Sequence, residues 1–352
     1  MKRRVITNSL VTLTQQGVEN SPAKVVPDGA VLVVVRSGVL KHTLPVALTG
    51  VPVTLNQDMK GLIPGDSVHG PYLARLVKAL ESTVLSWVRA TTADNFPIDK
   101  LLDFEINLPD LDEQRRIAAI LDHADQLRAK RRHILSNLES LRQSVFIDMF
   151  GDPVSNPQGL PAGTVRDLVE SADYGTSEKS TQQGEIAVLR MNNITYGGEI
   201  DLKDLKYMAL PADKYDRYTV RAGDVLFNRT NSAELVGKTA VYHGNSPLAY
   251  AGYLVRLRVR DGFSPDYLSG VLNSDYGKAT LRGMCKSIVG MANINAKEVQ
   301  TIRTLIPPAA DQAKYSRRVE EIRIEKDRQH SALAALDELF TSLQSRAFRS
   351  HL

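Results

Sequence analysis

The sequence is poor in cysteine, and this excludes two kinds of covalent or metal staple. Cys285 is the only cysteine among the 352 residues, so one chain can form neither an internal disulfide nor a cysteine-based zinc site. The seven histidines show no spacing typical of metal ligands. Cys285 follows Met284 and lies close to Ile288, a context that predicts a core residue rather than a nucleophile.

Long hydrophobic runs are also absent. A membrane span requires roughly 18 to 20 consecutive apolar residues, whereas the strongest short run is Ala30–Val35. The first residues, Met1–Arg4, are basic like the start of a secretory signal, but the polar residues Thr7 and Asn8 follow in place of an apolar segment. These features predict a cytoplasmic protein with no membrane partner.

Motifs of a self-contained enzyme are missing as well. The sequence has no Gly-x-x-x-x-Gly-Lys-Ser/Thr loop that would cradle phosphates. It has no Asn/Asp-Pro-Pro-aromatic motif of an adenine methyltransferase, because Asn107–Asp110 lacks the paired prolines and the aromatic residue. Asp110 and Glu113 imitate part of a nuclease carboxylate cluster, but acidic residues there also stabilise a helix N-terminus. We therefore predict no catalytic site and no small-molecule cofactor on this chain.

Charge and length set only broad limits. The chain has 44 Lys and Arg against 40 Asp and Glu, a formal net charge of +4, and a pI near 9.0. Such a balance permits an anionic partner without establishing one. A chain of 352 residues exceeds one typical domain, so we expect two globular units with connecting elements.

The informative feature of the sequence is an internal repeat. Leu108–Gln114 resembles Ile306–Gln312 at an offset of 198 residues, and Asp28–Leu32 resembles Ala222–Leu226 at an offset of 194 residues. A drift of a few residues is typical of loop insertions in a duplicated domain. Each half is therefore predicted to be a globular domain followed by an apolar-proline element and a long helix.

The two long helices are the clearest structural prediction. From Asp112 to Phe150, residues spaced by three and four indicate a coiled-coil face with one polar interruption. This stripe contains Ile117, Ile120, Ala124, Leu127, Arg131, Ile134, Leu138, Leu141 and Val145. The second helix carries Val319, Ile322, Leu333, Leu336, Leu339, Leu343 and Ala347. Asp110 or Asp112 is expected to cap the first helix, and Gly151 to end it.

Each helix has a polar middle, at Arg128–His133 and at Lys326–His330. Antiparallel pairing would bring these two segments together, where polar groups can set register and orientation at some cost in stability. A solvated basic patch explains the same residues equally well, and the sequence leaves both alternatives open.

The second half reads as a mixed domain with many short strands. Strands are expected at Ala187–Arg190, Asp224–Phe227 and Leu254–Val259, separated by glycine-rich turns. The spacing of apolar residues from Pro265 to Gly283 predicts a helix.

Several of these segments resemble a known family. Leu108–Leu121 and its continuation Phe146–Pro153 resemble the central conserved region of the specificity subunits of type I restriction–modification systems. In the second half, the similar segments are Leu189–Ile194, Gly223–Thr230, Val236–Ala240 and Met291–Asn295. The resemblance covers nearly the whole chain.

The resemblance implies an α+β fold with two repeated target-recognition domains. Each domain is followed by a long helix, and the two helices pair as an antiparallel coiled coil. The expected parts are a truncated first domain at 1–107, a central spacer helix at 108–151, a second domain at 152–305 and a distal spacer helix at 306–352. Each domain is implied to read one half of a split sequence in double-stranded DNA.

The resemblance also implies partners that carry the chemistry. Methyltransferase subunits, which bind S-adenosylmethionine, are implied to dock on the chain and modify adenines, and endonuclease/translocase subunits to join for cleavage. A helix from Asp112 to Phe150 would extend roughly 57 Å at about 1.5 Å per residue. This exceeds one turn of B-DNA, about 34 Å, so we expect the helices to set the gap between the two half-sites.

The candidate DNA contacts lie in the second half. Arg reads guanine and Asn reads adenine through paired hydrogen bonds, and such residues follow two expected strands. The candidate base-reading residues are Arg190, Asn192, Asn193, Asn228, Arg229 and Asn231. Lys238, Lys286 and Ser287 are candidates for phosphate contacts. The alternative for the Asn residues is a role in turns. Tyr196, Tyr218 and Tyr253 are expected to serve in packing.

The first half departs from the family pattern. By the repeat offset, it lacks a counterpart of roughly residues 151–194. Arg36, Lys41, Asn56, Gln57 and Lys60 remain candidate contacts there. A misassigned gene start, a true truncation and the combination of two copies of the chain are all open alternatives. The rival function is an assembly scaffold that binds methyltransferase subunits without reading DNA effectively.

Overall fold

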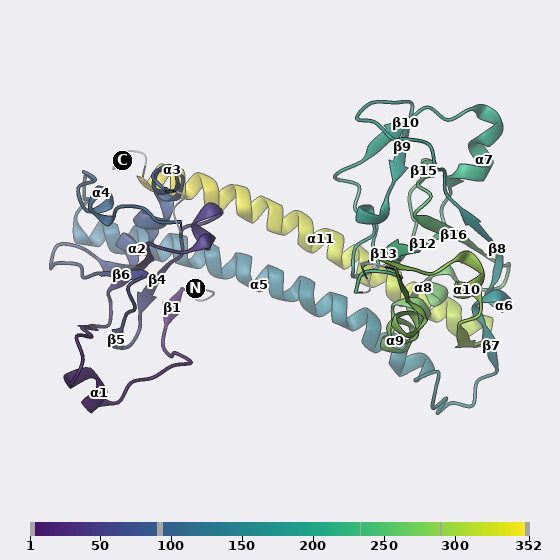
Figure 1. Cartoon of the computed structure of the whole chain (residues 1–352), viewed down its shortest axis with the longest axis horizontal. Helices are drawn as coiled ribbons and strands as arrows, with labels where there is room; N and C mark the ends of the chain where they lie inside the picture. Colours follow the sequence, from purple (N-terminus) through teal and green to yellow (C-terminus); the bar gives the residue numbers. More distant parts are fainter. Residues whose placement is uncertain (1–3, 90–93, 233, 289–290, 349–352) are drawn as a thin grey trace. The chain divides into compact units, whose positions relative to one another are not determined.

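The computed structural model describes residues 4–89, 94–232, 234–288 and 291–348. The chain divides into two compact units, Met1–His133 with His330–Leu352 and Ile134–Gln329 (Figure 1). Two long helices, α5 (Leu111–Phe150) and α11 (Ala309–Phe348), contribute residues to both units. Within each unit, helices and an antiparallel-rich sheet surround an apolar core, which agrees with the expected α+β class.

The first unit is built on a four-stranded sheet of order β1-β4-β3-β6. β3 is antiparallel to β4 and β6, whereas β1 is parallel to β4. Its elements are β1 (Val5–Ile6), α1 (Gln15–Glu19), β2 (Val25–Val26), β3 (Val31–Val34), η1 (Gly38–Lys41), β4 (Val46–Thr49), β5 (Val53–Thr54), β6 (Met59–Leu62), α2 (Gly70–Ala79), α3 (Glu81–Ser86) and α4 (Ile98–Leu102).

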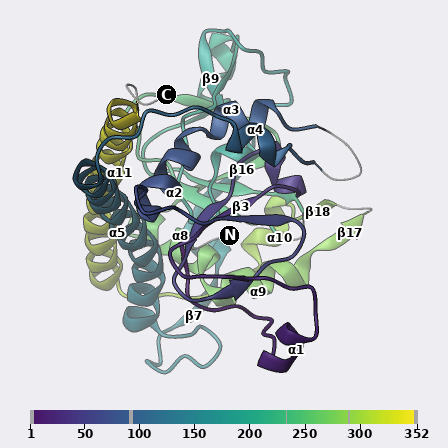
Figure 2. The ribbon, with the colours of Figure 1, turned by 90° about the vertical axis from the view of Figure 1, so that its left-hand side faces the viewer.

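Helix α2 joins the sheet of the first unit to the long helices. Ala74 and Val77 pack on Val31 and Val33 of the sheet, and Tyr72 belongs to a cluster with Ile117, Leu121 and Phe348. Figure 2 shows α2 between β3 and α5. In this unit the N-terminal half of α5 therefore lies beside the C-terminal end of α11, which is the antiparallel arrangement expected.

The second unit contains a four-stranded antiparallel sheet of order β14-β12-β16-β8 and a second sheet of order β10-β9-β15-β11. Its first elements are β7 (Ala162–Thr164), α6 (Val165–Leu168), β8 (Val169–Tyr174), β9 (Ile186–Leu189), η2 (Met191–Asn193), β10 (Lys206–Met208), η3 (Ala212–Lys214), α7 (Tyr215–Tyr218), β11 (Thr219–Val220) and β12 (Val225–Asn228). They are followed by β13 (Thr230–Asn231), β14 (Thr239–Val241), β15 (Leu248–Tyr250), β16 (Leu254–Val259), α8 (Pro265–Asn273), α9 (Asp275–Met284), β17 (Lys286–Ile288), β18 (Met291–Asn293), α10 (Ala296–Gln300) and β19 (Arg303–Leu305).

The internal repeat is visible in the topology. The strand order β4-β3-β6 of the first unit corresponds to β14-β12-β16 of the second, and α2 corresponds to α8. The units differ at the sheet edges, because β8 pairs with β16 in the second unit whereas β1 pairs with β4 in the first. The prediction of a repeated domain followed by a long helix is confirmed.

The ends of α5 follow the local signals in the sequence. The Asp110 carboxylate accepts a hydrogen bond from the backbone N–H of Glu113 at 2.8 Å, so Asp110, rather than Asp112, caps the helix. Gly151 has a φ of 70°, which a residue with a side chain rarely adopts. The helix therefore ends where the glycine was expected to end it.

The expected apolar stripe on α5 is partly wrong. Ile120, Leu127, Ile134 and Leu141 are exposed, whereas Leu121 and Leu135 are buried. The residues of α5 that are at least nine-tenths buried are Ile117, Ala118, Leu121, Ala124, Leu135, Phe146 and Phe150, with Gln114. The buried face is displaced because α5 packs on α2 and α8 as well as on α11. The stripe on α11 is also corrected, since Leu339 is exposed while Tyr315 and Phe348 are buried.

Two side chains of the polar middles are paired with carboxylates inside their own units. Arg128 Nε donates to the Asp337 carboxylate at 2.6 Å, and its guanidinium lies 4.3 Å from the centre of the Phe340 ring. Lys326 Nζ pairs with Glu199 and, at 3.7 Å, with Glu139. Neither cation is therefore a freely solvated charge. The meeting of the two polar middles stays a prediction.

The helix expected over Pro265–Gly283 is interrupted. Ser274 has an extended backbone with ψ of 161° and separates α8 from α9. Its hydroxyl accepts from the Gly277 N–H at 3.1 Å and donates to the Val271 carbonyl at 2.7 Å. Serine competes with the helix for these backbone groups, which explains a break that apolar spacing does not reveal.

Candidate nucleic-acid interface

The first candidate reading segment follows β9 and forms the short helix η2. The Arg190 guanidinium donates to the carboxylate and the backbone carbonyl of Asp204, both at 2.9 Å. Asn192 is exposed, and its amide lies 3.4 Å from the same carboxylate. The sequence did not predict Asp204 as part of this site, because no local pattern indicates that Asp204 lies beside η2 in the fold. Arg190 and Asn192 thus share one exposed carboxylate as their partner.

Asn193 is a structural residue. Its side chain is 2% exposed, its oxygen accepts from the Arg190 N–H at 2.9 Å, and its amide donates to the carbonyls of Asp201 and Asp204. All of its hydrogen-bonding capacity serves the turn. These bonds support the alternative role in a turn and argue against a base contact at Asn193.

Asn228 and Lys238 are also buried. Asn228 is fully buried at the end of β12, where its backbone pairs with Lys238 and Gly237. Lys238 Nζ donates to the carbonyls of Met191, at 3.0 Å, and Ile194, and burial lowers the pKa of this amine. Lys238 ties η2 to the β12–β14 hairpin from inside, and the burial of both side chains argues against a phosphate contact at Lys238 and a base contact at Asn228.

A small sheet of order β13-β18-β17 brings together the other candidates. Asn231 pairs with Ala292 across β13 and β18, and Ala292 pairs with Ser287 across β18 and β17. Asn231 and the backbone of Ser287 therefore lie in one row across three strands. Lys286 lies in β17 beside Ser287, but the side chains of both residues lie outside the described ones.

Arg229 connects this sheet to the larger one. Its guanidinium lies over the Tyr174 ring, 5.0 Å from the ring centre, and its backbone carbonyl accepts from Ile294 at 2.9 Å. Tyr174 comes from β8, and its hydroxyl accepts from the Ala296 N–H at 2.9 Å. Because Tyr174 is far from Arg229 in the sequence, no local pattern predicts this stacked pair.

The tyrosines expected in packing divide into two groups. Tyr218 packs against a small buried cluster, as predicted. Tyr196 is 60% exposed and Tyr253 is 53% exposed, so the prediction is wrong for these two rings. Exposed rings beside polar loops are suited to contacts with bases or sugars.

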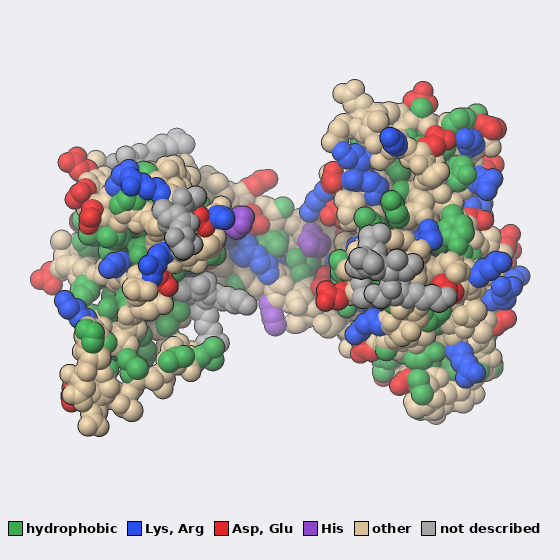
Figure 3. Space-filling model, viewed as in Figure 1, with side chains coloured by type: hydrophobic (Ala, Val, Ile, Leu, Met, Phe, Trp, Pro, Cys, Tyr) green, Lys and Arg blue, Asp and Glu red, His purple; other side chains and the backbone are tan. Residues whose placement is uncertain are grey.

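In the first unit, two of the candidate cations are paired. Arg36 Nε donates to the Asp58 carboxylate at 2.6 Å, and Lys41 lies 3.7 Å from Asp94. The Asn56 oxygen accepts from the Asp58 N–H at 3.2 Å, while Gln57 and Lys60 are exposed. Lys and Arg side chains are interspersed with Asp and Glu on the visible faces of both units (Figure 3).

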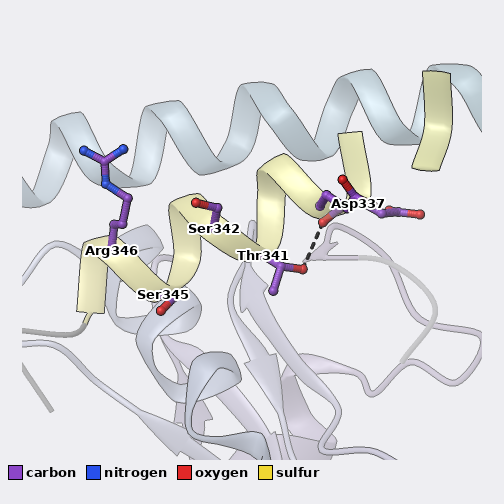
Figure 4. A pocket seen from close by; sticks show the side chains of 6 residues that line it. Asp337, Thr341, Ser342, Ser345 and Arg346 are labelled. Atoms are coloured by element: carbon purple, nitrogen blue, oxygen red, sulfur yellow. Dashed lines mark hydrogen bonds between the residues drawn. The ribbon is translucent and has the colours of Figure 1, made fainter. Parts of the chain in front are cut away.

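Other kinds of site find little support in the described residues. They contain no group of three or more His, Cys, Asp or Glu side chains that would hold a metal ion. Among them, no helix combines the length and apolar character that crossing a membrane requires. A groove on α11 is lined by one helix face, where the Thr341 hydroxyl donates to the Asp337 carbonyl at 2.9 Å (Figure 4). It presents a mixture of small polar groups and no converging set of charges.

Comparison with known proteins finds a family model and relatives that parts of this chain resemble. Residues 1–140 match the family model of the type I restriction modification DNA specificity domain. The chain is 37% identical over 129 residues to the EcoR124I/EcoR124II specificity subunit of Escherichia coli, covering 36% of this chain and 32% of that protein. It is 27% identical over 270 residues to the EcoKI specificity subunit of Escherichia coli K12, covering 70% and 57%. The matched parts thus span about a third and just over half of these relatives.

The fold is also similar to that of a solved structure. The crystal structure of a type I restriction–modification S subunit from M. genitalium has a TM-score of 0.59 to this chain at 14% identity, covering 92% of this chain and 83% of the other. Sequence relatives, family model and fold therefore agree in a likeness to the specificity subunits of type I restriction–modification systems.

Proposed function

We propose that this chain reads DNA and assembles a type I restriction–modification complex, in which partner subunits perform methylation and cleavage. The observation that carries the proposal is the duplicated arrangement of sheet, α2 or α8, and long helix, together with the specificity-domain match over residues 1–140. Two similar domains on paired helices suit a target made of two half-sites.

The second unit is proposed to read bases through Arg229, Asn231, Arg190 and Asn192. Arg190 already forms an ion pair with Asp204, whose side chain is 70% exposed. An exposed ion pair of this kind is worth about 0–1 kcal/mol, so a guanine edge can replace the carboxylate at little cost. Asp204 would then keep the guanidinium extended and oriented until DNA arrives.

The proposed partners are the subunits that would carry out the chemical steps. Methyltransferase subunits holding S-adenosylmethionine would supply the methyl group for adenine, and endonuclease/translocase subunits would supply cleavage. The chain itself would contribute recognition and a docking frame, with no catalytic residue. A second copy of the chain is a further candidate partner.

The long helices are proposed to set the distance between the half-sites. At about 1.5 Å per residue, the 40 residues of α5 extend roughly 60 Å. One heptad inserted within 123–135, with a matched heptad within 321–333, lengthens each helix by about 10 Å. The gap in the recognised sequence should then grow by about three base pairs at about 3.4 Å each. An unchanged gap in a folded, active variant would refute the spacer role.

Methylome sequencing tests the proposed function. The chain is expressed in a methylation-free host with a type I methyltransferase subunit from its own genome, and the methyltransferase alone serves as the control. A split motif with two different halves is expected when both domains read DNA, and a palindromic split motif indicates that two copies combine their second domains. No chain-dependent methylation, despite a stable complex with the methyltransferase, would favour the rival assembly scaffold and overturn DNA reading.

A further inference from the structure

The second unit contains a pocket between α5, α8, α9 and the turn after η2. Its walls include Arg142 and Phe146 of α5, Tyr196 of the turn, and Lys278 and Arg282 of α9. The turn depends on Gly198, whose φ is 78°, because a side chain there would collide with the Arg142 guanidinium and the Asn273 amide. The pocket is thus shaped by close packing of the turn against α5 and α8.

Three cations line this pocket without a carboxylate partner. Among the described residues, Arg142, Lys278 and Arg282 form no ion pair. The Arg142 guanidinium donates instead to the carbonyls of Gly197, at 2.5 Å, and Gly198, at 3.3 Å. Lys278 Nζ lies 4.2 Å from the centre of the Tyr196 ring. Positive charge is therefore concentrated at one partly enclosed place.

The surroundings of Lys278 disfavour the positive charge of its amine. Burial, followed by the charges of Arg142, Arg282 and Lys238, lowers the pKa of Lys278 to about 8. Two carboxylates lie at the pocket wall, Glu139 and Asp275. Glu139 is engaged by Lys326 at 3.7 Å, and neither carboxylate offsets the depression of the Lys278 pKa. Burial and the neighbouring cations therefore both disfavour the charged form of Lys278, while the Asp266 carboxylate interacts with Arg142.

A pocket in the first unit is also lined by several cations, but these are paired with carboxylates. It is lined by Arg4, Arg75, Lys78 and Arg128, and each of these cations has a carboxylate partner. Arg4 and Arg75 pair with Asp122, Lys78 pairs with Glu81, and Arg128 pairs with Asp125 and Asp337. The fold can therefore neutralise cations that line a pocket beside its long helices, as it does in this pocket of the first unit.

We propose that the pocket between α5 and α9 binds a phosphate group through Lys278 and Arg282, with Arg142 adding charge from behind the turn. An oxyanion would relieve the repulsion among the three cations and give them the partner they lack. Phosphate can come from DNA or from solution. We assign it to the DNA backbone, and that assignment rests on the proposed function.

The position of the pocket suits this role. The turn that forms its wall begins two residues after Asn193, so it continues directly from the candidate reading segment that carries Arg190 and Asn192. Contacts to phosphates position a protein on the duplex, whereas contacts to base edges specify sequence. A phosphate held at Lys278 would therefore place the segment at Arg190–Asn192 in a defined register on the DNA.

Inorganic phosphate tests the site on the full-length chain, without DNA. The melting temperature is followed at pH 7 in rising phosphate, with chloride keeping the ionic strength constant. We expect a saturable rise for the unmodified chain and for Lys297→Gln, a control that removes the same charge from an exposed position of α10. Lys278→Gln should lose the rise. Equal rises in all three proteins, or none in any, would overturn the phosphate site.

Duplex DNA then identifies the source of the phosphate. The complex with its methyltransferase subunit is titrated with its target duplex at several salt concentrations. Loss of one phosphate contact should lower the slope of log Kobs against log salt by about 0.9 for Lys278→Gln, with no change for Lys297→Gln. An unchanged slope in a complex that binds DNA, with phosphate binding intact, assigns the site to free phosphate and overturns the DNA assignment. If the unmodified complex fails to bind any duplex, the proposed function itself fails, and the inorganic phosphate titration still decides the site.

Discussion

Each long helix is attached to its domain by a buried glutamine at the same place in the repeat. The Gln114 side chain is fully buried. Its amide donates to the carbonyls of Ser67 and Pro109, at 3.0 and 2.9 Å, and its oxygen accepts from the His69 N–H at 2.8 Å. Since His69 precedes α2, this one side chain joins the start of α5 to the start of α2.

Gln312 repeats the arrangement in the second unit. It is 1% exposed, its amide donates to the Pro307 carbonyl and its oxygen accepts from the Ser264 N–H, both at 2.9 Å. Ser264 is the N-cap residue of α8. The two glutamines therefore make three and two hydrogen bonds respectively.

Replacing either glutamine by leucine should destabilise the protein by an amount that follows these bonds and their burial. Leucine has a similar volume but leaves the partners unpaired, at about 1–3 kcal/mol for each buried group. Both bonds of Gln312 are buried, so Gln312→Leu should cost at least about 2 kcal/mol. The three bonds of Gln114 are part-buried and Ser67 is exposed, so water can replace some of them and Gln114→Leu should cost about 1–3 kcal/mol. Gln114→Glu keeps the acceptor for His69 but loses both donors, so it should cost about 1 kcal/mol or more.

Urea unfolding measures these costs. Trp87, the only tryptophan, packs in the first unit near Phe104, so its fluorescence follows the unit that contains Gln114. Gln126→Leu is the matched control, because Gln126 is exposed on the same helix and surface changes usually stay within about 0.5 kcal/mol. A Gln114→Leu midpoint as close to the unmodified one as that of Gln126→Leu would refute the reasoning.

Three further predictions concern the second unit. Folding lowers the pKa of Lys278 from 10.5 to about 8, so the unfolded chain holds this proton more tightly, and the free energy of unfolding should rise between about pH 8 and 10.5. Thermal melts of Lys278→Met should lack this rise, and the same pH profile in the variant and the unmodified chain would contradict the buried charge. Phe146 packs against Phe150, Tyr267 and Tyr315 with ring centres 5.3–5.8 Å apart, so Phe146→Ala should cost about 3–5 kcal/mol in urea unfolding, and a cost below about 1 kcal/mol would contradict the packing. Asn193→Ala should lower stability by about 1–3 kcal/mol for each partner left unpaired while the methylated sequence stays unchanged, and a changed motif in a folded variant would restore Asn193 as a base reader.

Local signals in the sequence predicted the elements that depend on neighbouring residues. The Asp110 cap, the end of α5 at Gly151, and the strand β16 at Leu254–Val259 agree with expectation. Capping, positive φ and period-two alternation act over a few residues, so they can be recognised without knowledge of the fold. The duplicated motif around Gln114 and Gln312 likewise predicted that the same unit is built twice.

Burial could not be predicted in the same way. Asn193 and Lys238 stand in segments that look like exposed reading loops, yet Lys238 reaches the Met191 carbonyl 47 residues away and fills the interior. The face of α5 is a similar case, because packing on α2 buries Leu121 where helix periodicity alone favours Ile120. Both outcomes depend on contacts between residues distant in the chain.

The sequence by itself determined the duplication, the two long helices, the ends of α5 and the family that the chain resembles, because these rest on local patterns and on similarity. The tertiary structure decided which polar residues face outward, which cations are neutralised, and that Arg142, Lys278 and Arg282 share one pocket in which none of them forms an ion pair among the described residues. The physical reason is that the energy of a charge depends on its burial and on its neighbours in space, and folding brings those neighbours together from α5 and α9, which are far apart in the chain.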